Sequence, residues 1–206
     1  MQITKKLTQE NISKRILWVF GIYWVLTLTA FAIGYFLLPE GVFRGSPVVV
    51  LGNLVAQHQE FWPVFLRIVF FNLGLVLLVG AALNIQRVRG FPTGYVFIFV
   101  QGFMSGIIAG TNSFVSQVIS PYTLDGWLVA LRIGHLEFLG YTCIIASTIN
   151  IGLQNYDSWL PWKAKAQRIK TWKEIRFTRQ EVMGMIIGVI ILLIAGYNET
   201  ILFGGL

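Results

Sequence analysis

The sequence has few charged residues and few of the side chains that bind metals or form disulfides. Only 12% of its 206 residues are charged, about half the share in a soluble domain, whereas 55% are hydrophobic. This balance predicts an integral membrane protein. Cys143 is the single cysteine, which excludes an intrachain disulfide or a multi-cysteine metal site. The sequence has no His–Glu metal cluster, no nucleophile–His–acid set and no phosphate-binding loop. We therefore expect neither an enzyme nor a cofactor.

Long apolar runs are what the sequence has in abundance. A bilayer core about 30 Å thick is crossed by roughly 20 residues of helix. Five runs reach or approach this length, which predicts an all-α bundle of five spans in one polytopic domain, 1–206. The first run is longer than the roughly 7–15 residues of a cleaved signal peptide, so we expect it to be retained as a span. The expected spans are 16–38, 61–85, 93–114, 127–153 and 181–197.

The basic residues are distributed unevenly around these spans. If there are five, thirteen of the sixteen Lys and Arg residues fall on one side, and only Arg44, Arg67 and Arg132 fall on or near the other. The positive-inside rule then predicts a cytoplasmic N-terminus and an external C-terminus. We expect a bacterial inner membrane or an internal membrane, with anionic lipid at its cytoplasmic face as a partner. Nucleic acid is not expected as a partner.

Two segments outside the spans have an amphipathic composition. Residues 46–62 carry Val48, Leu51 and Leu54 at helical spacing, which predicts a helix lying on the membrane surface. The loop 154–180 mixes many cations with Trp159 and Trp172. We expect a second interfacial helix there, with Trp at headgroup depth. A docking surface for a cytoplasmic partner is the alternative.

Small and amide side chains recur inside the spans. Three glycines at intervals of four residues share one helix face, and a further pair has the same spacing; such faces allow helices in lipid to approach closely. We expect packing within the bundle, with a homodimer or partner-subunit interface as the alternative. The amides are expected to face the interior and to play a structural part. These residues are Gly102, Gly106 and Gly110, Gly184 and Gly188, and the amides Asn72 and Gln101.

Three ionisable residues lie within the fourth span, in the stretch LRIGHLEFLG. At about 1.5 Å per residue, Arg132 lies level with the outer boundary and Glu137 lies in the outer third of the bilayer core. Ideal helical phase places Arg132 and His135 on one face and Glu137 on another. A charge inside a span costs about 2.5–3.5 kcal/mol. We therefore expect Glu137 to be protonated, paired or in a polar cavity, with Arg67 as a candidate partner.

The segment 65–155 resembles the stage II sporulation protein M family. The likeness lies in Asn72-Leu73 with Gly80 in the second span, in Gly102 and Gly106 after Gln101 in the third, and in the acid Glu137 of the fourth. Ile133 occupies the family's histidine position, and His135 lies two residues before the acid. In sporulating bacteria, members of that family act as membrane scaffolds in complexes with cell-wall-degrading partners. The resemblance therefore implies a five-span scaffold or accessory subunit.

Three functions remain open from the sequence. The leading interpretation is a non-enzymatic scaffold or accessory subunit of a larger membrane complex, acting through helix–helix contacts at the polar cluster and the glycine face. The second is a small transporter or permease subunit in which Glu137 titrates or binds substrate. The third is a small subunit of a bioenergetic or pigment-bearing complex. Other membrane subunits or a second copy of the chain are the expected protein partners.

Overall fold

The computed structural model describes residues 2–56, 60–113, 120–160 and 163–204. It is predominantly helical. The helices are α1 (Gln2–Leu7), α2 (Ile12–Leu37), α3 (Pro47–Ala56), α4 (Phe61–Gly74), α5 (Gly94–Gly110), α6 (Leu124–Ala130), α7 (Leu136–Ser147) and α8 (Arg179–Gly204). Two π-helical segments, η1 (Leu75–Ala81) and η2 (Leu131–His135), continue α4 and join α6 to α7. Two short 3-10 segments are η3 (Ile149–Ile151) and η4 (Trp172–Glu174).

Within the described residues, four helical segments are long and apolar enough to cross a membrane. They are Ile12–Leu37, Phe61–Ala81, Leu124–Ile151 and Arg179–Leu202, which correspond to four of the five expected spans. The remaining expected span, 93–114, corresponds to the shorter apolar helix α5, which ends at Gly110. Residue 114 lies outside the described residues. The architecture is compatible with an integral membrane protein, as the composition predicts.

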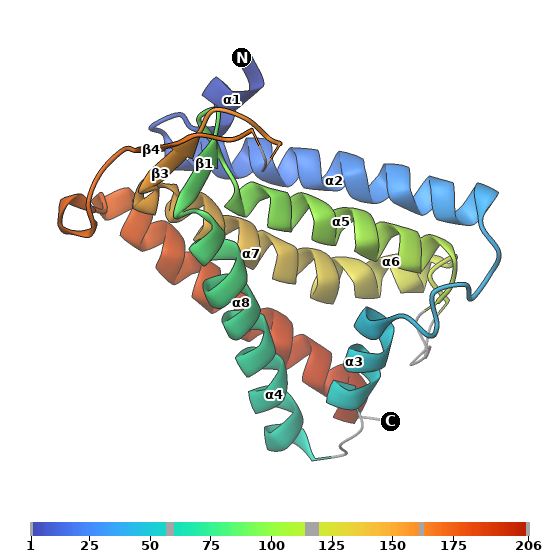
Figure 1. The fold of residues 1–206 in the computed structure, drawn as a ribbon. Helices are drawn as coiled ribbons and strands as arrows, with labels where there is room; N and C mark the ends of the chain where they lie inside the picture. Colours follow the sequence, from blue (N-terminus) through green and yellow to red (C-terminus); the bar gives the residue numbers. More distant parts are fainter. Residues whose placement is uncertain (1, 57–59, 114–119, 161–162, 205–206) are drawn as a thin grey trace.

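The helices form a bundle with a sheet at one end. α2 packs closely on α5, α7 packs on α8, and α4 packs mainly on α8 (Figure 1). Side chains from α2, α5, α7 and α8 form the main core, which includes Tyr23, Tyr95, Tyr141 and Leu192. Figure 1 shows α4 and α8 leaning away from α2 and α5 toward the end that holds α3. We call the two ends of the bundle the sheet end and the α3 end.

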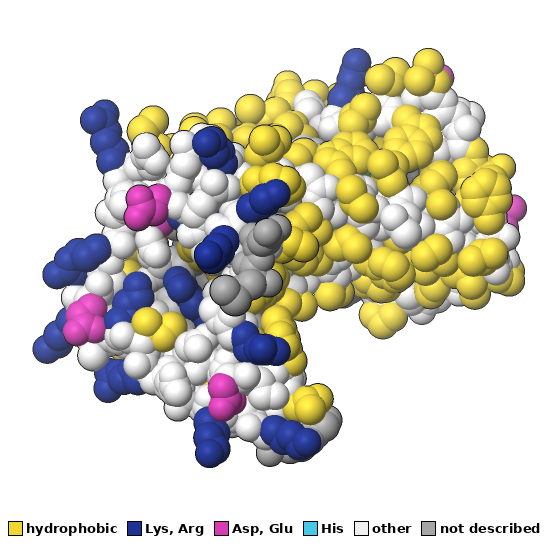
Figure 2. Space-filling view, turned by 90° about the horizontal axis from the view of Figure 1, so that it is seen from above, with side chains coloured by type: hydrophobic (Ala, Val, Ile, Leu, Met, Phe, Trp, Pro, Cys, Tyr) yellow, Lys and Arg dark blue, Asp and Glu magenta, His cyan; other side chains and the backbone are white. Residues whose placement is uncertain are grey.

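A small sheet closes the sheet end of the bundle. Its strands are β1 (Gln86–Val88), β2 (Phe91–Pro92), β3 (Gln154–Tyr156) and β4 (Ala166–Arg168), in the order β2-β1-β3-β4. β1 is antiparallel to β2 and parallel to β3, and β3 is antiparallel to β4. The sheet therefore ties the segment after α4 and η1 to the segment after α7. Figure 2 shows Lys and Arg side chains gathered at this end and hydrophobic side chains over the helices.

The interfacial helix predicted in 154–180 is wrong. Residues Gln154–Tyr156 and Ala166–Arg168 form strands, and only the three residues of η4 are helical within the described part of this loop. Backbone pairing of β3 with β1 and of β4 with β3 satisfies donors and acceptors that a helix would satisfy internally. Pro161 also disfavours a continuous helix, because it lacks a backbone N–H. Trp159 and Trp172 are nevertheless exposed, as an interfacial position requires.

The predicted helix in 46–62 is present as the ten residues of α3. Val49 is buried against Ala30 and Ile108, near the α3 ends of α2 and α5, whereas Val48 is exposed. The helix is therefore anchored to the bundle by Val49. Its position on a membrane surface stays a prediction. Residues 57–59, in the second half of the predicted segment, lie outside the described residues.

Candidate functional site

A polar cluster lies inside the helical bundle where α4, α7 and α8 meet. Tyr141 Oη is within hydrogen-bonding distance of Asn72 Oδ1, at 2.9 Å, and of Glu137 Oε1. Glu137 and Tyr141 are one helical turn apart on α7, so their side chains share a face. Glu199, on α8, is close enough to interact electrostatically with both Glu137 and Tyr141. We call Asn72, Glu137, Tyr141 and Glu199 the carboxyl cluster.

The hydrogens of the carboxyl cluster can be assigned in two ways. In the first, a protonated Glu137 donates to Tyr141 Oη, and the Tyr141 hydroxyl donates to Asn72 Oδ1. Asn72 Nδ2 is then buried without a partner among the described residues. In the second, the Asn72 amide is flipped, its Nδ2 donates to Tyr141, and Tyr141 donates to an ionised Glu137. Apolar surroundings and the neighbouring Glu199 favour the first assignment, since it buries no charge at Glu137.

Glu199 is the residue that sequence reasoning missed. The fifth span was expected over 181–197, so Glu199 fell in the tail beyond it and was not singled out. α8 instead continues to Gly204 and carries Glu199 alongside Glu137. The signal was available in the sequence, because Thr200, Ile201 and Leu202 prolong the helical run beyond Asn198 and Glu199.

His135 lies apart from the carboxyl cluster. Its ring is buried, stacks on Trp24 at a centroid distance of 3.9 Å, and places Nδ1 2.8 Å from Tyr23 Oη. His135 therefore helps to join η2 to α2. Arg132 is exposed, although ideal helical phase places it on the same face as His135. The difference arises because η2 is a π-helix, whose wider turn changes the phase between the two residues.

The other predicted polar residues do not join Glu137. Within the described residues, no salt bridge connects Arg67 to Glu137, so the expected pairing is not formed. Arg67 is half-buried on α4. Gln101 is half-buried on α5 and takes no part in the hydrogen bonds of the carboxyl cluster.

Both glycine faces are occupied by helices of the same chain. A Cβ on Gly106 would lie 2.2 Å from the backbone oxygen of Thr27, and one on Gly110 would lie 2.2 Å from that of Phe31. Gly102 faces the ring of Tyr23. On the other seam, Gly188 packs against Ile144 and Gly140, and Gly184 packs against Ser147. The glycine faces thus serve α2–α5 and α7–α8 packing, as the first of the two expectations states.

Two further polar networks lie nearer the sheet end. Asn84 is fully buried; its Nδ2 donates to Ile145 O at 2.8 Å, and its Oδ1 accepts from Gly94 N at 3.1 Å. This one amide joins the segment after η1 to α5 and α7. The sequence offers it only as a polar residue at the edge of an apolar run, so it was not singled out.

The second network is a buried ion pair between α2 and α8. Arg15 Nη1 lies 3.5 Å from Glu181 Oε1 and donates to Ala146 O at 2.7 Å. Glu181 Oε2 also accepts from Thr178 N at 2.9 Å, which caps the start of α8. Arg15 and Glu181 are both nearly inaccessible. Arg15 and Glu181 therefore each have ionic and hydrogen-bond partners within the chain. We interpret the pair as a structural link between α2 and α8 and call it the clasp.

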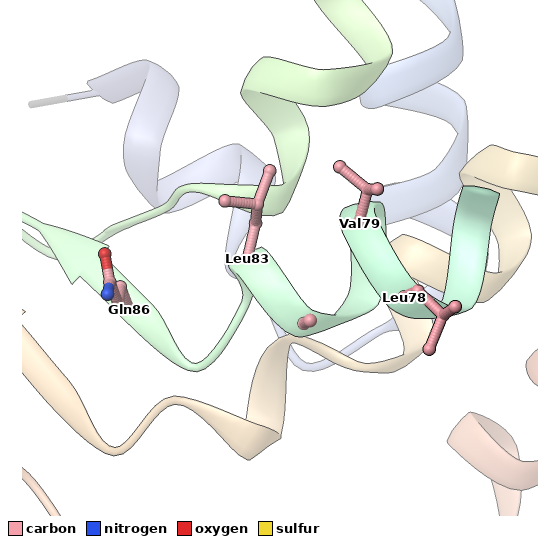
Figure 3. Close-up of a pocket in the computed structure, with 5 residues that line it drawn as sticks. Leu78, Val79, Leu83 and Gln86 are labelled. Atoms are coloured by element: carbon pink, nitrogen blue, oxygen red, sulfur yellow. The ribbon is translucent and has the colours of Figure 1, made fainter. Parts of the chain in front are cut away.

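A shallow hollow of about 230 Å³ lies on the outer surface near the sheet end. Leu78, Val79, Leu83 and Gln86 line it (Figure 3), together with Ala82. It contains no ionisable side chain and does not reach the carboxyl cluster. In the part of the chain that the structure describes, no group of three or more His, Cys, Asp or Glu residues is arranged to hold a metal ion.

The fold and the cluster together define a helical protein, compatible with insertion in a membrane, in which two partly buried carboxyl groups lie close together among apolar helices. Comparisons with family models, with curated proteins and with solved structures find no match. The functional argument therefore depends on the geometry of the chain itself.

Proposed function

We propose that the chain is a five-span integral membrane protein and a non-enzymatic scaffold or accessory subunit of a larger membrane complex. The fifth span of this proposal is α5, whose 17 residues extend about 25 Å at 1.5 Å per residue. That length approaches the roughly 30 Å of a bilayer core. With five spans, the sheet end is cytoplasmic, and the basic residues gathered there support this orientation.

The observation that carries the scaffold proposal is that the interior is occupied. Both glycine seams are filled by helices of the same chain, and Glu137 is engaged by Tyr141. Partner subunits must therefore bind outer helix faces, and not the glycine face as the sequence interpretation has it. The outer face of α4 and η1 is the best candidate, because α4 packs mainly on α8 and leaves Phe70 and Leu78 more than 70% exposed.

Site-specific photo-crosslinking in cells tests this proposal. A photoreactive phenylalanine analogue at Phe70 or Leu78 should crosslink to a discrete protein, either another subunit or a second copy of the chain. The matched control is Leu17 on α2, which is similarly exposed at 70% and should crosslink only to lipid. Lipid adducts alone at all three positions would contradict the scaffold proposal.

The carboxyl cluster favours proton-coupled transport as a second candidate function. Two interacting carboxyl groups on neighbouring spans can exchange protons, and ionisable residues inside membranes commonly mark ion or proton pathways. The test is proton flux into liposomes that contain the purified chain and a pH-sensitive dye. Transport through the cluster predicts flux that is lost in E137Q and E199Q and retained in E174Q, whose acid is exposed on η4. Absence of flux in the unmodified chain would remove this candidate.

A further inference from the structure

A second hollow, of about 310 Å³, lies at the sheet end and is lined by charged and apolar side chains. It begins at Leu153, two residues beyond the end of the candidate span Leu124–Ile151. The proposed orientation therefore places it close to the cytoplasmic surface of the bilayer. Its lining residues come from β3, β4 and the segment that follows β4, and they are Leu153, Gln154, Ala166, Arg168, Lys170 and Trp172.

Lys170 in this hollow lies near a further cation outside the lining, Arg87, and the two are incompletely neutralised. Burial lowers the pKa of Lys170, and the positive charge of Arg87 lowers it further, whereas Glu181 and Glu174 act in the opposite direction. Burial also lowers the pKa of Arg87. Arg87 Nη2 donates to Ile149 O at 2.8 Å, but its buried Nε has no hydrogen-bond partner within the described chain. An anion nearby would relieve both the repulsion and the desolvation.

The nearby acids already have other partners. Glu174 Oε2 accepts a hydrogen bond from Thr171 N at 2.6 Å and so caps η4. Glu181 is committed to Arg15. Lys170 Nζ donates to Asn150 O, which holds its ammonium group near the end of α7 and η3. Arg168 is exposed beside it and can offer guanidinium N–H groups to a planar or tetrahedral anion.

We propose that this hollow binds the phosphate group of an anionic phospholipid headgroup. This inference rests on the proposed orientation of the chain. The mixed lining favours a lipid over free phosphate, because Leu153 and the exposed indole of Trp172 supply apolar contact beside Arg168 and Lys170. Trp at headgroup depth together with cations on phosphate is the usual arrangement at a membrane interface. Basic residues at the sheet end attract anionic lipid in general, whereas this hollow would bind one lipid headgroup at a defined position.

Binding to short-chain lipids tests the proposal on the purified full-length chain alone, in detergent. The probes are dihexanoyl phosphatidylglycerol, dihexanoyl phosphatidylcholine and inorganic phosphate, and native mass spectrometry measures their occupancy. The test variant is R168Q/K170Q. The matched control is K163Q/K165Q, which removes two exposed cations from the same loop but outside the hollow.

Phosphatidylglycerol should bind best, and R168Q/K170Q should weaken it about tenfold or more while K163Q/K165Q leaves it unchanged. Equal weakening of phosphatidylglycerol binding in both double variants would overturn the site and indicate diffuse electrostatic attraction to the whole loop. Inorganic phosphate that binds as tightly as phosphatidylglycerol would overturn the lipid assignment. If R168Q/K170Q does not fold, R168Q serves as the second variant, because Arg168 is exposed and its replacement should not disturb folding. R168Q should still weaken phosphatidylglycerol binding, and unchanged binding would overturn the site.

This test is independent of the scaffold proposal, because no partner protein is present. Failure to crosslink at Phe70 and Leu78 with intact phosphatidylglycerol binding would remove the scaffold and leave the lipid site. The reverse pattern would remove the lipid site and leave the scaffold.

Discussion

At the scale of single residues, two acids of this chain, the buried Glu181 and the partly buried Glu137, have opposite electrical environments. Glu181 faces the guanidinium of Arg15, whereas Glu137 faces the neutral Tyr141 hydroxyl and lies near another acid, Glu199. Glu181 is therefore best satisfied as an anion. Glu137 is best satisfied as an acid that donates one hydrogen bond. Replacement by glutamine, which keeps the shape and can donate but carries no charge, separates the two cases.

We expect E181Q to destabilise the chain and E137Q to leave its stability nearly unchanged. Removing one partner from a buried ion pair costs about 3–5 kcal/mol, because the remaining charge is left buried. The Gln amide at position 137 can instead donate to Tyr141 as the protonated acid does. Unfolding of the purified variants in mixed detergent micelles measures both free energies. A large loss in E137Q would favour an ionised Glu137 and the flipped Asn72 amide.

The Tyr141 hydroxyl connects two groups and provides a second residue-scale prediction. Y141F should cost about 1–3 kcal/mol in the free energy of unfolding, because the partly buried Glu137 and Asn72 both lose their hydrogen-bond partner. The matched control is Y197F, which removes a hydroxyl from an exposed tyrosine on α8. The same unfolding assay applies, and equal stability of the two variants would show that the contacts around Tyr141 contribute nothing.

At the scale of elements, the glycines of α5 determine how closely α2 can approach. The four-residue spacing was legible in the sequence, and it predicted a packing face. The sequence did not reveal which helix packs on that face, because the spacing is equally suitable for α2, another span or a second copy of the chain. Only the three-dimensional structure selects α2, through the contacts of Gly106 with Thr27 and of Gly110 with Phe31.

G106A should separate α2 from α5 and destabilise the bundle, whereas G21A should not. The added methyl at position 106 would meet the backbone oxygen of Thr27 at 2.2 Å, and a backbone atom cannot rotate away. Overpacking of this kind costs about 1–3 kcal/mol. A methyl group at position 21 of α2 would have no neighbour within 4 Å. G21A therefore measures the effect of the Gly-to-Ala change on helix propensity alone. Thermal unfolding followed by circular dichroism compares the two, and matching midpoints would remove the glycine-seam argument.

The small sheet shows where element prediction fails. Strands such as Gln154–Tyr156 and Ala166–Arg168 are three residues long and lack an alternation of apolar and polar residues. β3 pairs with β1, which is far away in sequence, and β4 pairs with β3, so local composition does not reveal these strands. The spans were predictable because twenty apolar residues in a row have few alternatives in a membrane.

At the scale of the whole molecule, the five-span proposal places the two ends of the bundle on opposite sides of the membrane. Cysteine labelling in intact cells tests this in a C143S background. Cys143 is buried, so the substitution removes a poorly accessible thiol. A membrane-impermeant maleimide should label V42C, near the α3 end, and should label K165C, near the sheet end, only after the cells are opened. Both positions are exposed. Labelling of K165C in intact cells would invert or abolish the proposed topology.

The carboxyl cluster shows which part of a site a sequence reveals. Glu137 was identified because a charge within a span is costly, and that argument needs no structure. Its partners came from α4 and α8, and the phase change introduced by η2 separates His135 from Arg132 in a way that ideal helical geometry does not anticipate. The free-energy cost of placing one charged residue in a span can be judged from the sequence. Which residues of different helices lie next to it cannot.

The clasp between Arg15 and Glu181 has a consequence for how the chain is made. The two residues are separated by 166 positions. The buried guanidinium of Arg15 therefore cannot be neutralised until the last span, which carries Glu181, has been synthesised. The sheet is similarly delayed, because β1 cannot complete its pairing until β3 has been synthesised. During biogenesis Arg15 is therefore best accommodated at the lipid–water boundary, where it can remain hydrated. A ribosome-bound chain that stops before residue 181 should already pack α2 on α5 but leave Arg15 without its acidic partner, and release of the chain would set the time of final assembly.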